Sequence, residues 1–100
     1  MNFSRTDNQN DTTLRIEGVL DAVTTPEIRP MVEALVNDKR MSILVDVSAL
    51  RIIDSSGVGV IVSLFKRAKS YGGVVRISGL KDQPLTIFKL LRLDKVFAVA

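Results

Sequence analysis

The chain contains 100 residues, 46% of them hydrophobic and 25% charged, which is enough for one buried core and too little for two domains. It has no cysteine and no histidine, and this excludes a disulfide framework, a Cys/His zinc site and nucleophiles activated by histidine. The net charge of +3 comes from 14 Lys and Arg residues that are spread along the chain with few aromatics. This pattern favours a solvated surface over a nucleic-acid interface.

The first ten residues are polar and lack the basic and apolar regions of a signal peptide. The longest strongly apolar run, Val58 to Val62, is far shorter than the roughly 20 residues of a membrane span. We therefore expect a cytoplasmic protein that forms one domain over residues 1–100 and does not insert into a membrane.

Two strands joined by a turn are expected to open the chain. Thr12–Glu17 alternates, with Leu14 and Ile16 on one side, and a weaker strand pattern covers Phe3–Asp7. A helix should follow, because Thr25 before Pro26 is a good N-cap, and Thr24 with Glu27 offers an alternative capping box. Pro30 would disturb such a helix, so we expect an irregular first turn or a later start.

The second half of the chain alternates strands and helices. Ser42–Val47 is almost wholly apolar, which predicts a strand buried on both faces. The expected elements after it are a helix over Gly57–Ser70, a strand over Val74–Ser78, a helix over Pro84–Leu93 and a strand over Val96–Val99. Together these predict an α/β fold with a mostly parallel sheet of about five strands, an N-terminal hairpin and helices packed on the sheet.

The most distinctive local sequence, Ile53 to Val60, lies between a strand and a helix, where α/β proteins tend to place their sites. A serine there can cap the helix, and the helix N-terminus also tolerates a phosphate. From residue chemistry alone, Ser55 and Ser56 are equally open to two interpretations: a plain N-cap, or a modified serine whose phosphate opposes binding of a partner.

Three sharper interpretations of the chain are disfavoured. Gly57 and Gly59 lack the third glycine of a dinucleotide fingerprint, although a small nucleotide binder remains a minor possibility. Ser56 is not in a nucleophile elbow and has no histidine to activate it. Asp46 could resemble the phospho-acceptor of a receiver domain, but no adjacent acidic pair is available to hold magnesium. We expect no catalytic, cofactor or metal residues.

The helix from Gly57 carries two apolar stripes. Val60, Ile61, Leu64 and Ala68 fall on one face, which a sheet would cover. Val58, Val62 and Phe65 form the second stripe, about 100° around the helix. Burial is the expectation for Phe65, whereas Val58, beside Ser56 in the first turn, is the best candidate for an exposed partner contact.

At these residues the chain resembles the STAS domains, and within them the single-domain anti-sigma factor antagonists. The matching segments, in order, are Leu14–Asp21 with Thr24 and Ile28, Leu44–Leu50, the hallmark D-S-S-G-x-G of Asp54–Gly59, and Leu91–Phe97. The resemblance covers roughly residues 12–99, and several spaced motifs make it more specific than any one of them.

The resemblance implies a STAS fold and a partner-switching protein that is not an enzyme. The unphosphorylated form would bind an anti-sigma factor that is also a serine kinase. Phosphorylation of Ser56 would release it, and a PP2C-type phosphatase would reset the switch. By the same resemblance, Asp21 and Thr24 lie near the phosphoacceptor, Asp54 and Ser55 flank it, and Gly57 and Val58 complete the recognition patch. The nucleotide belongs to the kinase, so no cofactor is expected.

The chain departs from the family pattern in three places, none at the phosphoacceptor. Pro30 interrupts a helix, Arg92 replaces a common glycine, and the chain stops just after the last strand. The short C-terminus bears on dimerisation, and we expect a monomer or weak homodimer. An alternative is a constitutive STAS subunit of a larger complex, such as a lipid transporter or a stressosome-like assembly, in which Ser56 is only a helix cap.

Overall fold

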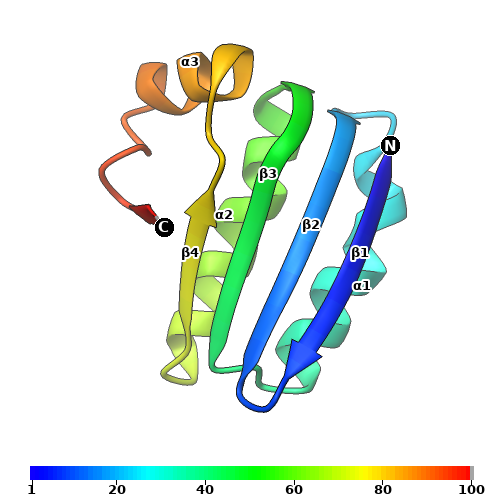
Figure 1. The fold of residues 1–100 in the computed structure, drawn as a ribbon, viewed down its shortest axis with the longest axis vertical. Coiled ribbons are helices and arrows are strands. Elements are labelled where there is room, and N and C mark those ends of the chain that lie inside the picture. Colours follow the sequence, from blue (N-terminus) through cyan, green and yellow to red (C-terminus); the bar gives the residue numbers. More distant parts are fainter. Residues whose placement is uncertain (100) are drawn as a thin grey trace.

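The structure is a computed structural model that describes residues 1–99, and for residues 98–99 it describes the backbone alone. Its elements are β1 (Asn2–Asn8), β2 (Asp11–Leu20), α1 (Thr25–Asn37), β3 (Ser42–Ile53), α2 (Ser55–Ser70), β4 (Val74–Ser78), α3 (Asp82–Leu90) and β5 (Ala98–Val99). Helices α1 and α2 lie side by side behind the sheet in Figure 1, and α3 lies at the end of the sheet where β2 and β3 finish.

The sheet has the strand order β1-β2-β3-β4-β5 and is mixed. The predicted N-terminal hairpin is confirmed, because β1 and β2 pair antiparallel, whereas the pairs β2–β3, β3–β4 and β4–β5 are parallel. Four strands make up the body of the sheet, and β5 adds only two residues at its edge. Right-handed crossovers through helices are the usual way to join such parallel neighbours.

One hydrophobic core lies between the sheet and the two helices behind it. β2 contributes Leu14 and Ile16, β3 contributes Ile43 and Val45, and all four are at most 1% exposed. The apolar faces of both helices are buried against them. These residues are Ile28, Val32 and Leu35 of α1, and Val60, Ile61, Leu64 and Ala68 of α2.

The expectation that β3 is buried on both faces is wrong. Ile43, Val45 and Val47 are buried, but the intervening Leu44 and Asp46 are only partly buried. The reason is that α1 and α2 both lie on one face of the sheet, so alternate residues of β3 point away from the core. The strand is also twice as long as expected, because β2 continues to Leu20 and pairs with β3 as far as Ile53.

The first residues of α1 and α2 differ from those that the proline and glycine residues predicted. α1 begins at Thr25 and continues through Pro30, so neither Thr25 as N-cap nor a delayed start is correct. Both Pro26 and Pro30 lie on the exposed side, where water can hydrate the carbonyl that Pro30 leaves unbonded. α2 begins at Ser55 rather than Gly57.

The C-terminal elements are shorter than expected. α3 ends at Leu90 because Arg92 adopts a left-handed conformation with φ of 58°. The N–H groups of Leu93 and Arg92 bond back to the carbonyls of Phe88 and Lys89 at 2.8 and 3.0 Å, which is the Schellman arrangement. The expected strand over Val96–Val99 reduces to the two residues of β5.

Neither a membrane-spanning helix nor a metal cluster is found in the part of the chain that the structure describes. No helix there is long and apolar enough to cross a bilayer. Residues 1–99 also contain no group of three or more acidic side chains placed to hold a metal ion.

Candidate functional site

The loop between β2 and α1 forms one side of the site. Oδ1 of Asp21 accepts hydrogen bonds from the N–H groups of Val23 and Thr24 at 3.0 and 3.1 Å. The Thr24 hydroxyl donates to the Val19 carbonyl and accepts from the N–H of Asp21, both at 2.9 Å. Thr24 is thus the N-cap of α1 by position, but its side chain bonds within the loop rather than capping the helix. The loop is held rigid and presents Val23, which is 82% exposed.

The turn between β3 and α2 forms the other side. Asp54 is the N-cap of α2, and its Oδ1 accepts from the N–H of Gly57 at 3.0 Å. Its Oδ2 accepts from the N–H of Ala22 at 3.2 Å, so the same carboxylate joins the two sides. The Asp21–Thr24 loop and the Asp54–Gly57 turn, predicted from motifs far apart in the sequence, therefore meet at one end of the sheet.

Neither serine caps the helix, so that simple interpretation of Ser55 and Ser56 is wrong. Ser55 and Ser56 are the first two residues of α2, Ser55 exposed and Ser56 partly buried. No hydrogen bond within residues 1–99 uses the Ser56 hydroxyl, and no buried side-chain oxygen there lacks a partner. The Ser56 Oγ therefore reaches solvent, although the residue is partly buried. The N–H groups of Ser55 and Ser56 also have no intrahelical acceptor, as is usual in a first helical turn.

Gly57 allows α2 to start directly against the end of β2. A β-carbon at this position would lie 2.5 Å from the carbonyl oxygen of Leu20 and 2.8 Å from Cγ1 of Ile53. The position is buried, so Gly57 serves close packing within the fold. It forms neither a phosphate cradle nor a surface that a partner could touch through a side chain.

Val58 is not exposed, contrary to our expectation, and its side chain is only 4% accessible. It belongs to the stripe with Val62 and Phe65, and the closing segment packs on this stripe at Phe65. The rings of Phe65 and Phe97 pack edge to face with centroids 4.9 Å apart, and Phe97 packs in turn against Phe88. Sequence periodicity identified the stripe but could not show that the C-terminal segment would fold back over it.

Two exposed residues of the site were missed. Val23 lacks a periodic signal because it lies in a loop. Gly59 is exposed, and a β-carbon there would meet nothing within 4 Å, so the fold does not require glycine at this position. The unexplained glycine inside a helix was itself the available signal, since glycine there is destabilising relative to alanine by about 0.5–1 kcal/mol. Gly59 lies one helical turn after Ser55, and without a side chain it leaves the backbone of α2 exposed there.

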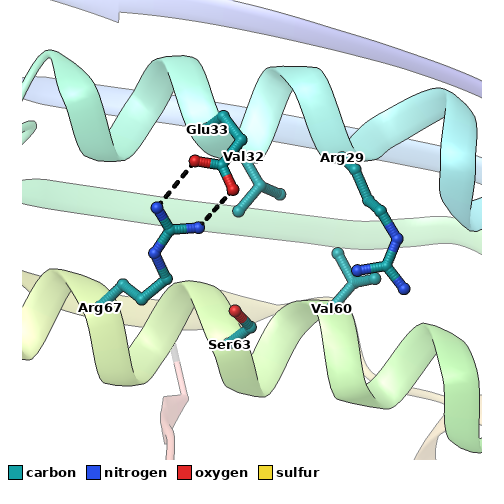
Figure 2. A pocket seen from close by; sticks show the side chains of 6 residues that line it. All are labelled: Arg29, Val32, Glu33, Val60, Ser63 and Arg67. Atoms are coloured by element: carbon teal, nitrogen blue, oxygen red, sulfur yellow. Dashed lines mark hydrogen bonds and ion pairs between the residues drawn. The ribbon is translucent and has the colours of Figure 1, made fainter.

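A shallow hollow of about 50 Å³ lies between α1 and α2 next to this surface. Figure 2 shows Arg67 of α2 reaching across to Glu33 of α1 with two hydrogen bonds, of 2.6 and 2.7 Å. The Arg67 guanidinium lowers the pKa of the Glu33 carboxyl, mainly through this hydrogen bonding. Arg29, Val32, Val60 and Ser63 complete the lining, which has room for a few water molecules and none for a nucleotide.

Asp46 is engaged within the fold, which argues against a receiver-like phospho-acceptor. One carboxylate oxygen accepts from the Arg15 guanidinium at 3.1 Å, and the other accepts from the N–H of Ser48 at 3.0 Å. Partial burial alone would raise the pKa of Asp46. The hydrogen bonds from Ser48 and the charge of Arg15 outweigh it and hold the pKa below its usual value.

The fold and the site together define an α/β domain with a polar, solvent-open turn at the N-terminus of its central helix. The STAS domain family matches residues 2–100, and the chain belongs to this family. A relative from Bacillus subtilis (strain 168), named anti-sigma-B factor antagonist, is 30% identical over 96 residues, covering 93% of this chain and 84% of the relative. The predicted resemblance is thus confirmed.

Solved structures show the same fold. An anti-sigma factor antagonist from Mycobacterium paratuberculosis matches 98% of this chain and 83% of its own, with 20% identity and a TM-score of 0.88. The anti-sigma factor antagonist SpoIIAA in its unphosphorylated form matches 99% of this chain and 87% of its own, with 18% identity and a TM-score of 0.79. The phosphorylated form of SpoIIAA from Bacillus matches 99% and 91%, with 19% identity and a TM-score of 0.78.

Proposed function

We propose that this chain is an anti-sigma factor antagonist that works by partner switching, a binding module and not an enzyme. Its unphosphorylated form binds an anti-sigma factor that is also a serine kinase. Phosphorylation of Ser56 releases that partner, and a PP2C-type phosphatase restores the binding form. The name of the Bacillus subtilis relative supports the class of partner.

One observation carries the proposal: the Ser56 hydroxyl is open to solvent while Asp54 caps the helix. A serine that the fold needed as a cap would be occupied by the N–H groups of its own helix. Ser56 is free of that role, so a kinase can modify it without unfolding the first turn of α2.

The same position accommodates the phosphate it would receive. Phosphoserine adds about −1.5 to −2 charge at neutral pH, and helix N-termini stabilise negative charge. The N–H groups of Ser55 and Ser56, which have no acceptor within the helix, lie at this N-terminus of α2. SpoIIAA matches this chain about equally in its unphosphorylated and phosphorylated forms, with TM-scores of 0.79 and 0.78. We infer that phosphorylation changes the charge of the surface and leaves the fold unchanged.

The proposed recognition surface comprises Asp21, Val23, Ser55, Ser56 and Gly59. Oδ1 of Asp21 is used within the loop, whereas its other oxygen has no hydrogen bond within residues 1–99 and can meet a cation of the partner. Val23 offers apolar area, and Gly59 lets the partner approach the helix backbone closely. A phosphate at the centre of this surface would introduce a desolvation penalty and repel nearby carboxylates.

The test compares Ser56→Ala, Ser56→Asp and the neighbouring control Ser55→Ala for binding to the cognate kinase in the presence of nucleotide. Ser56→Ala should bind as the wild type does and Ser56→Asp should bind weakly. Both Ser56 variants should resist phosphorylation, whereas Ser55→Ala, which removes a hydroxyl from the recognition surface but keeps the phosphoacceptor, should still be phosphorylated. Intact-mass analysis of the native protein, with peptide mapping of residues 52–66, should find one phosphate on Ser56 that a phosphatase removes. A single unmodified mass, with equal binding by all three variants, would instead indicate a constitutive subunit.

A further inference from the structure

The end of β3, just before the phosphoacceptor turn, lies beyond the strand that pairs with it. The β3–β4 ladder runs from Ser42↔Val74 to Asp46↔Ser78 and stops there. On its other side β3 stays paired with β2 as far as Ile53. In the described chain, the β4-side edge of β3 beyond Val47 therefore has no strand to bond to, and buried backbone groups there require another partner.

The side chain of Gln83 supplies that partner at the last residue of β3. Its Oε1 accepts from the N–H of Ile53 at 2.9 Å, and its Nε2 donates to the carbonyl of Ile53 at 2.8 Å. One side-chain amide thus replaces a residue of the missing strand, with both bonds partly buried. Such a bidentate bond fixes the position and the orientation of the Ile53 peptide groups.

The backbone around Gln83 is shaped to deliver it to this edge. Gly79 has φ of 82°, and a β-carbon there would lie 2.6 Å from Cα of Ser48, so the chain leaving β4 passes directly against β3. Asp82 then adopts φ of 54°, a conformation that non-glycine residues rarely take, and α3 begins. Backbone strain of this kind persists where surrounding contacts determine it.

Ile53 in turn determines where the site lies. It immediately precedes Asp54, whose carboxylate caps α2 and bonds to Ala22. The Ile53 side chain is fully buried, and its Cγ1 lies 2.8 Å from where a β-carbon of Gly57 would be. A displacement of the Ile53 backbone would therefore move both Asp54 and the first turn of α2, which carries Ser56.

We propose that Gln83 is a positioning residue for the phosphoacceptor: through both backbone groups of Ile53 it holds the Ser56 turn in the geometry that the kinase and the partner surface recognise. This inference rests on the proposed function. Helix α3 contributes no residue to the proposed contact surface, yet through Gln83 it would affect phosphorylation and partner binding at Ser56.

The test uses Gln83→Ala and Gln83→Glu, with Leu90→Ala, at a largely exposed position of the same helix, as the matched control. A Glu carboxylate can accept from the Ile53 N–H but faces the Ile53 carbonyl without a proton to donate, whereas a protonated Glu restores both bonds. Near neutral pH, Gln83→Glu should therefore lose the bond to the Ile53 carbonyl and shift the Ser56 turn as Gln83→Ala does, while its Ile53 amide stays better protected than in Gln83→Ala. It should recover as the pH falls toward the ordinary carboxyl value of about 4.3. The wild type and Leu90→Ala, measured over the same range, account for titration elsewhere.

Three measurements separate positioning from simple stability. Hydrogen exchange of the Ile53 amide should be about tenfold faster in Gln83→Ala, relative to the Val45 amide in the same strand, because one hydrogen bond has been removed. The NMR signal of the Ser56 amide should shift in both Gln83 variants, and KM for phosphorylation should rise about fivefold to tenfold with kcat nearly unchanged. Leu90→Ala should match the wild type in every readout.

Each outcome has a distinct meaning. Unchanged Ile53 exchange, or an unshifted Ser56 signal in both Gln83 variants, would overturn the positioning role. So would wild-type phosphorylation kinetics in a variant that has lost only thermal stability. If Gln83→Ala does not fold, the pH-dependent recovery of Gln83→Glu decides the question. If the wild type itself is not phosphorylated at Ser56, the proposed function fails, while the exchange and NMR measurements still test the link from Gln83 to the turn.

Discussion

The two glycines of the D-S-S-G-x-G segment should respond in opposite ways to the same added methyl group. At Gly57 the new β-carbon would meet the Leu20 carbonyl oxygen at 2.5 Å and two side-chain carbons below 3 Å. Overpacking of this kind is destabilising by about 1–3 kcal/mol, and contact with backbone places Gly57→Ala toward the upper end. At Gly59 the methyl group enters open space, so Gly59→Ala should gain about 0.5–1 kcal/mol from helix propensity.

Equilibrium unfolding in urea, followed by far-UV circular dichroism because the chain has no tryptophan, measures both free energies. Thermal midpoints should differ in the same direction, by about 4–8 °C per kcal/mol for a domain of this size. Binding of the cognate kinase should weaken in Gly59→Ala although its fold is more stable, because the methyl group occupies the bare helix surface. If both variants shifted stability in the same direction, the packing argument for Gly57 and Gly59 would be refuted.

Three further changes test other parts of the structure. Asp54→Ala should lower the free energy of unfolding by about 2 kcal/mol, because it removes both the cap of α2 and the bond to Ala22. Asp54→Asn should lose less stability because it keeps a capping oxygen. Urea unfolding of both variants measures the two free energies. Arg92→Gly should raise the thermal midpoint, with a gain of about 0.5–1 kcal/mol, by relieving the left-handed C-cap of α3, and an unchanged midpoint would contradict this. The pKa of Asp46 is lower in the folded state than in the unfolded state. The Asp46 carboxylate should therefore stabilise the fold above the unfolded-state pKa of about 3.9, and this stabilisation should be lost as the pH falls through the folded-state pKa. In acid, the thermal midpoint of Asp46→Asn should consequently fall less steeply with pH than that of the wild type.

Local patterns predicted most elements of the fold. The alternation in β2, the β-branched run in β3 and the apolar face of α2 each produced the expected element, because each is set by the period of the backbone itself. Arg92, which stands where the family pattern favours glycine, adopts a left-handed conformation at the end of α3. The structure thus gives a physical reason for that glycine.

The motifs also placed the six expected contact residues at one end of the sheet, but four of them are engaged within the fold. Val58 is buried and Gly57 packs against Leu20, while Asp54 and Thr24 use their side chains within the fold. Burial depends on what else folds over a residue, and no local window contains that information. Val23 and Gly59, which the sequence did not single out as contacts, are exposed, as Ser55 is.

Sequence by itself determined the alternation of strands and helices and the serine at the start of the central helix, since periodicity and turn chemistry act over a few residues. Only the tertiary structure decided which face of β3 is buried, that Asp54 rather than a serine caps α2, and that Gln83 bonds to the end of β3. Two of the bonds at these positions, Asp54–Ala22 and Gln83–Ile53, join segments about 30 residues apart. Their formation depends on how the whole chain packs, because each buried polar group must find its partner wherever the fold brings one.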